Sequence, residues 1–356
     1  MTVVTILGAG AMGSALTTPA LRAGHEVRLW GTWLDDDILA DLRAGRPHPR
    51  IKVPIDDAAQ LFDAGDLGAA LDGSDVAILA ISSEGVVDVL ERAVPFLRAG
   101  MPILMTTKGF GRDAAGRVSL LPPLLEATLP AGLAGRCPLV AIGGPCKANE
   151  VAVDRPTATL YGSADEAVAA DAGALLSTPS YRIATTADVA GLEASAAMKN
   201  VYAIALGVAD GLGELGGEPW HNLKAAVFAQ AVAEITLVSE ALGGQGATAV
   251  GLAGVGDLEV TGLSGRNKVY GMRLGKGEDA ATALAAMEAA GQTVEGVAAA
   301  RFAAALAEER GLTGLPLLEA IGALLDGVDE PAVVLEDAVL PPQAPTRAPQ
   351  RARGVG

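Results

Sequence analysis

The chain begins with a short, mostly apolar segment that runs directly into a glycine-rich turn, and this junction constrains the fold most strongly. Residues 3–7 have strand character, Gly8, Gly10 and Gly13 follow with the spacing Gly-x-Gly-x-x-Gly, and residues 14–23 have helical character. In such a unit the glycines permit a tight turn, a close approach of backbone to a pyrophosphate, and close packing of helix on strand. The predicted dinucleotide-binding residues of this turn are Gly8, Gly10, Ala11, Met12 and Gly13. A purely structural glycine turn is the alternative interpretation.

Strand-like and helix-like segments alternate through the first half of the chain. Further strands are expected at residues 27–30, 75–81, 103–106, 139–142, 157–161 and 181–183. Such alternation is typical of a mostly parallel sheet with helices on both faces. From about residue 188 the pattern is helical, with helices expected at residues 189–211, 223–242, 280–290 and 297–310.

We therefore expect an α/β N-terminal Rossmann-type dinucleotide-binding domain followed by an all-α C-terminal domain. The first is expected at residues 1–187 and the second, which would carry the substrate and catalytic groups, at residues 188–329. Residues 330–356 are rich in Pro and Ala, and we expect a disordered tail there, with a short basic interaction arm as the alternative.

Composition excludes several classes of protein. The net charge of −16 argues against a general nucleic-acid surface, which needs basic patches. With two cysteines and three histidines at no metal-ligand spacing, neither a disulfide scaffold nor a metal site is expected. The N-terminus lacks a secretory signal and no apolar run is long enough to cross a bilayer, so we expect a cytoplasmic protein without membrane insertion. Aromatic residues make up only 3%, so the core must consist of small residues, which suit closely packed helices.

The stretch from Gly254 to Asn267 is the most informative about chemistry, because it places Asp257 and Arg266 among glycines and hydroxyls. Arginine can hold a phosphate or carboxylate, and a carboxylate can orient a nearby amine. Lys199 lies in a helical segment of small apolar residues, where a buried lysine without function would be costly. The alternative is a lysine whose ammonium reaches the surface. Lys108 follows the carboxyl end of a predicted strand, where ligands bind in open α/β sheets.

Five segments, taken with the glycine turn, resemble the NAD(P)-dependent glycerol-3-phosphate dehydrogenase family, with its 6-phosphogluconate dehydrogenase-like C-terminal domain. They are Thr107-Lys108-Gly109, residues 144–152, residues 197–205, residues 254–267 and Glu295-Gly296. Their order and spacing agree over roughly residues 3–325. The resemblance implies reversible hydride transfer between NAD or NADP and the pair dihydroxyacetone phosphate and sn-glycerol 3-phosphate, by a homodimer.

The resemblance also implies roles for individual residues. Lys199 would be the general acid in reduction and the base in oxidation, Lys108 would bind and polarise the substrate, and Asp257 would pair with Lys199 and adjust its pKa. The implied substrate-binding residues are Asn200, Thr261, Ser264, Arg266 and Asn267. The implied cofactor-binding residues beyond the glycine turn are Thr32, Ser82, Lys108, Ala148, Arg266 and Glu295.

Cofactor choice stays open, because no acidic residue stands at the tip of the second predicted strand. Such a residue would hydrogen-bond the adenosine ribose and favour NAD. Asp35, Asp36 and Asp37 come several residues later and are interpreted as the start of a helix.

The chain departs from the family pattern around the predicted pocket. Ile81-Ser82 replaces a Pro-Ser pair, Cys146 and Lys147 replace a serine and an apolar or aromatic residue, and Trp220 replaces a glycine. Cys146 is interpreted as a packing residue, since no histidine accompanies it, and Lys147 as an added cation at the pocket rim. These changes leave open another phosphorylated or phosphonate ketone as substrate. A ketopantoate reductase or β-hydroxyacid dehydrogenase-like enzyme is a second alternative, because its opening glycine turn looks similar. A non-catalytic nucleotide sensor is the third, and the intact set of Lys108, Lys199, Asp257 and Arg266 argues against it.

Overall fold

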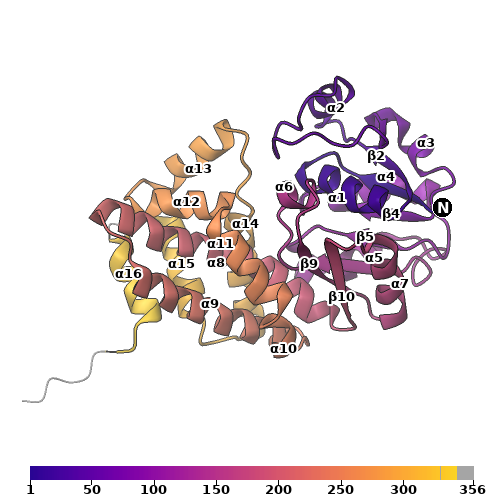
Figure 1. Ribbon diagram of the computed structural model, residues 1–356. Helices are drawn as coiled ribbons and strands as arrows, with labels where there is room; N and C mark the ends of the chain where they lie inside the picture. The colour runs from indigo at the N-terminus through magenta and orange to yellow at the C-terminus, as the bar shows by residue number, and fades with distance from the viewer. Residues whose placement is uncertain (329, 343–356) are drawn as a thin grey trace, which may run out of the picture.

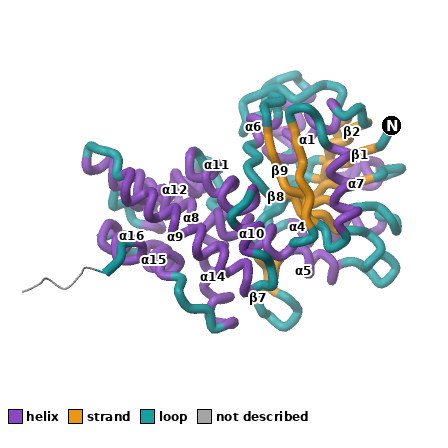
Figure 2. The backbone as a smooth tube through the Cα atoms, turned by 60° about the horizontal axis from the view of Figure 1, so that its bottom comes forward, coloured by secondary structure: helices purple, strands orange, loops and turns teal. Residues whose placement is uncertain are grey.

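The computed structural model describes residues 1–328 and 330–342. Strands occupy the first part of the chain and helices the second, and the two parts lie side by side (Figures 1 and 2). This arrangement confirms the expected fold class, an α/β Rossmann-type part followed by a helical part. Among the described residues, no helix is both long and apolar enough to span a membrane.

The first part is built on one eight-stranded sheet. Its strands, in chain order, are β1 (Val3–Leu7), β2 (Glu26–Trp30), β3 (Gln60–Phe62), β4 (Val76–Leu79), β5 (Ile103–Met105), β8 (Leu139–Gly143), β9 (Thr157–Gly162) and β10 (Tyr181–Thr186). Their order across the sheet is β10-β9-β8-β5-β4-β1-β2-β3, and every pair is parallel except β8 with β9. All the expected strands are present. The three-residue strand β3 and the hairpin of β6 (Phe110–Arg112) and β7 (Val118–Leu120) were not expected, because such short segments carry little periodicity.

The strand order places a crevice at the centre of the sheet. The chain leaves β1 toward β2 and β3, then returns to the other side of β1 to form β4 and β5. In open α/β sheets ligands bind at such a reversal, outside the carboxyl ends of the strands. The helices that accompany the strands are α1 (Ala11–Arg22), α2 (Asp36–Arg43), α3 (Leu67–Leu71), α4 (Val86–Ala93), α5 (Leu121–Thr128), α6 (Ala148–Val151) and α7 (Glu166–Leu176).

The second part surrounds one long, almost wholly buried helix, α8 (Val189–Gly216). The sequence predicted the end of this helix at Gly211, but the helix continues to Gly216. Gly211 packs against the backbone of Met272, so this part of the helix remains buried. The other elements are α9 (His221–Ala241), α10 (Gly246–Ala249), η3 (Leu252–Gly256), α11 (Asp257–Leu263), α12 (Arg266–Gly275), α13 (Ala280–Ala289), α14 (Glu295–Arg310), α15 (Pro316–Asp326) and α16 (Pro331–Val339).

Glycine allows α8 and α12 to approach closely. A Cβ on Gly207 of α8 would overlap the carbonyl oxygen of Lys268, and a Cβ on Gly271 of α12 would overlap that of Ile204. The backbones therefore touch where larger residues would hold the helices apart. This contact confirms the expectation drawn from the small-residue composition, and it fixes the first turn of α12 beside the middle of α8.

The prediction of disorder from residue 330 onward is wrong for the segment that forms α16. Leu335 of α16 is fully buried and belongs to the same core as α8 and α9. The Pro-rich composition misled the prediction, because Pro331 occupies the first turn of a helix, where proline is tolerated. The rest of the predicted tail, residues 343–356, lies outside the described residues.

Candidate active site

The glycine turn joins β1 to α1 at the centre of the sheet, as the sequence predicted. Gly8 has a φ of 112°, which favours glycine, and a Cβ on Gly13 would overlap the carbonyl oxygen of Gly8. Gly10 is the N-cap of α1, and Ala11 is its first residue. The turn is thus a cradle whose helix N-terminus can receive the phosphates of a dinucleotide.

A buried carboxylate ties the end of β2 to this turn. Oδ2 of Asp35 accepts hydrogen bonds from the backbone N–H of Thr32 and from its hydroxyl, both at 2.9 Å, and from the N–H of Ala9 at 3.3 Å. Asp36 and Asp37 lie in the first turn of α2, which confirms their interpretation as a helix start. The additional role of Asp35 was not predicted, because it depends on the fold of the turn.

A loop missed by sequence reasoning lies over the glycine turn. His48 is fully buried, its Nε2 is 3.0 Å from the carbonyl oxygen of Ala9, and its Nδ1 accepts from the N–H of Arg50 at 3.1 Å. Burial lowers the pKa of His48, in keeping with a neutral ring whose Nε2–H donates to Ala9. The loop thereby holds Nη1 of Arg50 3.9 Å from the place of a Cβ on Gly10.

Two lysines from different parts of the molecule share one buried carboxylate. Nζ of Lys199, from α8, lies 2.5 Å from Oδ1 of Asp257, and Nζ of Lys108, from the loop after β5, lies 2.5 Å from Oδ2. Nζ of Lys199 also donates to the hydroxyl of Thr261 at 3.1 Å. The predicted contact between Asp257 and Lys199 is present, and the contact with Lys108 joins the helical part to the edge of the sheet.

Local sequence explains how Asp257 reaches this position. It is the first residue of α11 and follows a π-helical turn, η3, in which a Cβ on Gly254 would overlap the carbonyl oxygen of Ala249. Such turns are often found at functional sites. Thr261 lies four residues after Asp257 and therefore on the same face of α11.

The environments of the two lysines shift their pKa values in opposite directions. Burial lowers the pKa of Lys199, the charge of Lys108 lowers it further, and Asp257 offsets only part of this. For Lys108, burial also acts to lower the pKa, but the charge and hydrogen bond of Asp257 outweigh it, so the pKa is raised. Burial would raise the pKa of Asp257, but the two ammonium groups lower it. Of the two lysines, Lys199 is thus the one whose ammonium gives up its proton more readily.

The predicted amide groups form a second network next to this cluster. Nδ2 of Asn267 donates to Oδ1 of Asn200 at 3.0 Å, and Nδ2 of Asn200 lies 3.3 Å from Oε2 of Glu295. Oε1 of Glu295 lies 3.3 Å from Nη2 of Arg266, the first residue of α12. The structure thus brings four predicted residues together around the N-terminus of α12.

The remaining predicted residues lie around the rim. Ser82 is exposed just beyond β4, and Ala148 is the first residue of α6. Ser264 is not part of the amide network; its hydroxyl accepts from Nζ of Lys147 at 2.6 Å. Burial raises the pKa of the Cys146 thiol, in agreement with its interpretation as a packing residue.

Models of known protein families match both parts of the chain. The model described as NAD-dependent glycerol-3-phosphate dehydrogenase N-terminus matches residues 3–169, and the corresponding C-terminus model matches residues 188–336. The chain belongs to the NAD-dependent glycerol-3-phosphate dehydrogenase family. The resemblance drawn from the motifs is therefore confirmed.

Individual relatives agree with the family models. A protein of Archaeoglobus fulgidus named NADP(+)-dependent glycerol-3-phosphate dehydrogenase is 38% identical over 275 residues, which cover 77% of this chain and 80% of that protein. A glycerol-3-phosphate dehydrogenase, NAD(P)+, of Geobacter metallireducens is 35% identical over 353 residues, or 99% of each chain. The crystal structure of glycerol-3-phosphate dehydrogenase from Coxiella burnetii matches with a TM-score of 0.82 and 29% identity, covering 96% of this chain and 99% of that one.

This member of the glycerol-3-phosphate dehydrogenase family also buries a carboxyl group that sequence reasoning missed. Glu193, on α8, is fully buried, and neither carboxyl oxygen has a hydrogen-bond partner among the described residues. Burial raises its pKa to about 8, and the nearby charge of Lys108 offsets this only in part. The side chain is therefore uncharged at neutral pH.

Glu193→Gln is expected to flatten the pH dependence of stability. Between the ordinary pKa of 4.5 and about 8, the unfolded chain ionises this group while the folded chain keeps it protonated, so the free energy of unfolding falls as pH rises. The free energy of unfolding should be measured by urea denaturation at about pH 5.5 and about pH 7.5. Between these two pH values it should fall by about 2 kcal/mol more in the wild type than in the variant. Glu259→Gln, at an exposed position of α11, is the matched control. Equal pH dependence in wild type and Glu193→Gln would show that Glu193 is ionised in the fold.

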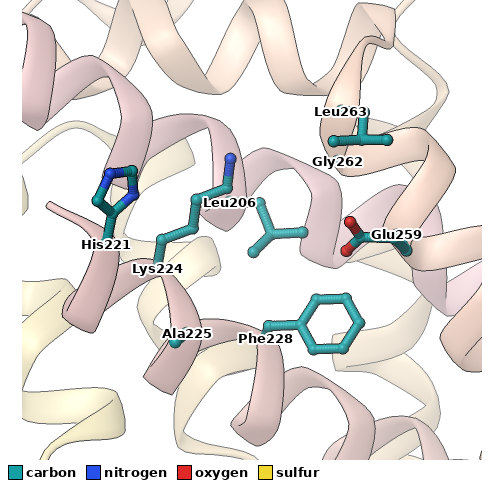
Figure 3. A pocket seen from close by; sticks show the side chains of 8 residues that line it. All are labelled: Leu206, His221, Lys224, Ala225, Phe228, Glu259, Gly262 and Leu263. Carbon is teal, nitrogen blue, oxygen red and sulfur yellow. The ribbon is translucent and has the colours of Figure 1, made fainter. Parts of the chain in front are cut away.

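A hollow of about 320 Å³ lies in the helical part, between side chains of α8, α9 and α11 (Figure 3). It is lined by Leu206, His221, Lys224, Ala225, Phe228, Glu259, Gly262 and Leu263. None of these is a predicted site residue, and Lys224 already pairs with Asp210 at 2.8 Å. Asp257 and Thr261 contact Lys199 from the same helix, α11, that contributes Glu259 to the hollow. The hollow thus shares α11 with the lysine cluster, but none of its lining residues belongs to that cluster.

Proposed function

We propose that this protein is an NAD(P)-dependent glycerol-3-phosphate dehydrogenase that interconverts dihydroxyacetone phosphate and sn-glycerol 3-phosphate. The observation that carries this assignment is the cluster of Lys199, Asp257 and Lys108 at the carboxyl edge of a dinucleotide-binding sheet. Arg266 lies nearby at the N-terminus of α12, where backbone N–H groups favour an anion. Relatives with this named activity are 35–38% identical over most of the chain.

The residues present fit a nicotinamide dinucleotide. A side chain on Gly8 or Gly13 would fill the cradle, and α1 begins directly at it. When bound, the cofactor supplies or accepts the hydride. On the cofactor side we place the glycine turn with Thr32, Ser82, Ala148 and Glu295, because each lies at or beyond the carboxyl end of a strand or at the facing start of α14.

Reduction of a ketone places negative charge on its oxygen, and the two lysines can stabilise that charge. Lys199, whose pKa is lowered, donates the proton in reduction and takes it back in oxidation. Lys108, whose pKa is raised, stays protonated and polarises the carbonyl. Asp257 holds both ammonium groups at 2.5 Å and so fixes their separation.

The phosphate end of the substrate is assigned to the start of α12. Arg266 and Asn267 occupy the first turn of this helix, and Asn200 is bonded to Asn267. Thr261 lies between this region and Lys199, to which it is bonded. Ser264 completes the set as the last residue before the helix N-cap.

Arg266→Ala should mainly weaken substrate binding, since a guanidinium binds phosphate through two parallel hydrogen bonds. We expect the KM for dihydroxyacetone phosphate to rise by the equivalent of about 2–4 kcal/mol, with a smaller change in kcat. Steady-state kinetics would measure both constants. Arg273→Ala is the matched control, because this residue is on the same helix and pairs with Glu278. An unchanged KM in Arg266→Ala would mean that the phosphate binds elsewhere.

The function is tested by the oxidation of NADH and of NADPH in the presence of different ketones. Dihydroxyacetone phosphate, its phosphonate analogue and ketopantoate should be compared at equal concentration. The proposal expects turnover with the phosphate ester and little with ketopantoate. Preferred turnover of ketopantoate would instead support the related reductase.

The division of the chain, its location and its assembly complete the proposal. We place the boundary near residue 187, because β10 ends at Thr186 and α8 begins at Val189. A cytoplasmic location is supported by two free cysteines, Cys137 and Cys146, as is usual in a reducing compartment. A homodimer is suggested by the resemblance to the family, and light scattering of the purified protein would test it.

A further inference from the structure

The turn after β8 crosses from the sheet to the helical part. A Cβ on Gly256 would lie 3.3 Å from Cδ of Pro145, and Nζ of Lys147 donates to the hydroxyl of Ser264 at 2.6 Å. Gly256 immediately precedes α11, and Ser264 immediately follows it. The turn therefore runs along α11, from the residue before Asp257 to the approach of α12, where α6 and α11 face each other (Figure 2).

The charged side chains around this turn carry a net positive charge that a dianion could balance. Asp257 offsets one of the two buried lysines, Lys108 and Lys199. Glu295 offsets Arg266, and among the described residues no carboxylate pairs with Lys147. The site thus carries two uncompensated positive charges, one on the lysine cluster and one on Lys147. A phosphate monoester carries close to two negative charges above its second pKa of about 6.

We propose that Lys147 is a specificity-determining residue whose ammonium leaves Ser264 and binds the phosphate of a phosphomonoester substrate, on the side opposite Arg266. This inference rests on the proposed function, because it concerns the same substrate. Its basis is the position of Ser264, two residues before Arg266 and three after Thr261, which is itself bonded to Lys199. A cation held at Ser264 is therefore beside the anion site and not at the reacting carbonyl.

Lys147 lies on the Rossmann part of the molecule, across from the other groups assigned to the phosphate. Arg266 and Asn267 belong to the helical part, whereas Lys147 belongs to the Rossmann part. A phosphate bound by both would draw the two parts together around the substrate, and a ketone without phosphate would lack this bridge. A monoanionic carboxylate would satisfy only one of the two uncompensated charges.

The experiment uses three variants of the full chain, each assayed for KM and kcat with dihydroxyacetone phosphate and for the KM of NADPH. Lys147→Met removes the ammonium, and Lys147→Arg keeps a cation. Ser264→Ala removes both the resting partner of Lys147 and a hydroxyl that the proposed function places near the substrate. Inorganic phosphate serves as a competitive inhibitor that reports binding without turnover. Circular dichroism and thermal unfolding establish that each variant is folded.

We expect Lys147→Met to raise the KM for dihydroxyacetone phosphate and the Ki of inorganic phosphate about tenfold, with kcat and the KM for NADPH nearly unchanged. Lys147→Arg should restore most of the loss. Ser264→Ala should raise the KM for dihydroxyacetone phosphate less than Lys147→Met does, because Lys147 can still bind the phosphate when its resting partner is absent. The KM of the wild type should also rise as pH falls through about 6, where the phosphate loses a charge, and this rise should be smaller in Lys147→Met.

Three outcomes would overturn the role of Lys147. Equal losses in Lys147→Met and Ser264→Ala would show that the bridge only holds the two parts together. A raised KM for NADPH alone would assign Lys147 to the cofactor, and an unchanged KM for both would assign it to neither. If the wild type itself failed to reduce dihydroxyacetone phosphate, the proposed function would be wrong. That result is distinct from the three above, in which the wild type is active and only the role of Lys147 is wrong.

Discussion

Lys199→Met is expected to lower kcat by at least about 100-fold in both directions of the reaction while leaving cofactor binding intact. The ammonium of Lys199 is buried, bonded to Asp257 and Thr261, and has its pKa lowered, so methionine fills its volume but cannot exchange a proton. Single-turnover kinetics would measure the chemical step, and fluorescence titration with NADPH would measure cofactor binding.

The matched control is Lys276→Met. Lys276 caps the C-terminal end of α12 and pairs with Glu214 on a half-exposed surface, so its loss should cost little activity. Lys108→Met adds a second comparison, because the proposed function assigns Lys108 to polarising the carbonyl and not to proton transfer. We expect Lys108→Met to lower kcat less than Lys199→Met does. Near-normal turnover in Lys199→Met would contradict the assignment of the proton donor.

Asp257→Asn should have the second large effect, and it should act on both stability and catalysis. The substitution leaves two ammonium groups buried beside an uncharged amide, and breaking a buried ion pair by removing one partner costs about 3–5 kcal/mol. Without the carboxylate, the mutual repulsion of Lys108 and Lys199 would lower the pKa of Lys199 further. Reduction needs the protonated lysine, so the fraction of active enzyme would begin to fall at a lower pH than in the wild type.

The pH–rate profile distinguishes this explanation from simple loss of structure. The high-pH limb for reduction should move to lower pH in Asp257→Asn, and part of the activity should return as pH falls. Glu259→Gln, two residues further along α11, removes an exposed carboxylate that lines the hollow and should leave the profile in place (Figure 3). A reduced rate with an unshifted limb would mean that Asp257 acts only through folding.

Local sequence was sufficient for the elements that carry the cofactor. The spacing of Gly8, Gly10 and Gly13 after an apolar strand encodes a turn that depends on residues close in the chain. The same holds for Lys199, whose burial could be anticipated from the small apolar residues around it on one helix. Helix ends were less certain: the stop predicted at Gly211 did not occur, because glycine there serves packing against α12.

Other features depend on contacts between distant segments. Asp257 is 149 residues from Lys108, and no local pattern shows that one carboxylate serves both lysines. The unpartnered carboxyl of Glu193 and the loop that carries His48 were missed for the same reason. The sequence assigned α16 to a disordered tail because the surrounding residues are rich in proline. In the structure Leu335 of α16 is completely buried in the core that includes α8 and α9.

The sequence by itself determined the order of strands and helices, the cradle at Gly8–Gly13 and the residue types of the active site, since these follow from periodicity and from steric rules that act over a few residues. Only the tertiary structure decided which charges meet. The pKa values of Lys199 and Lys108 diverge because burial and a shared Asp257 act on them together, and burial is a property of the packed molecule. For the same reason Lys147, which the sequence identified only as a cation at the rim, acquires its proposed role from the contact with Ser264 across the two parts of the chain.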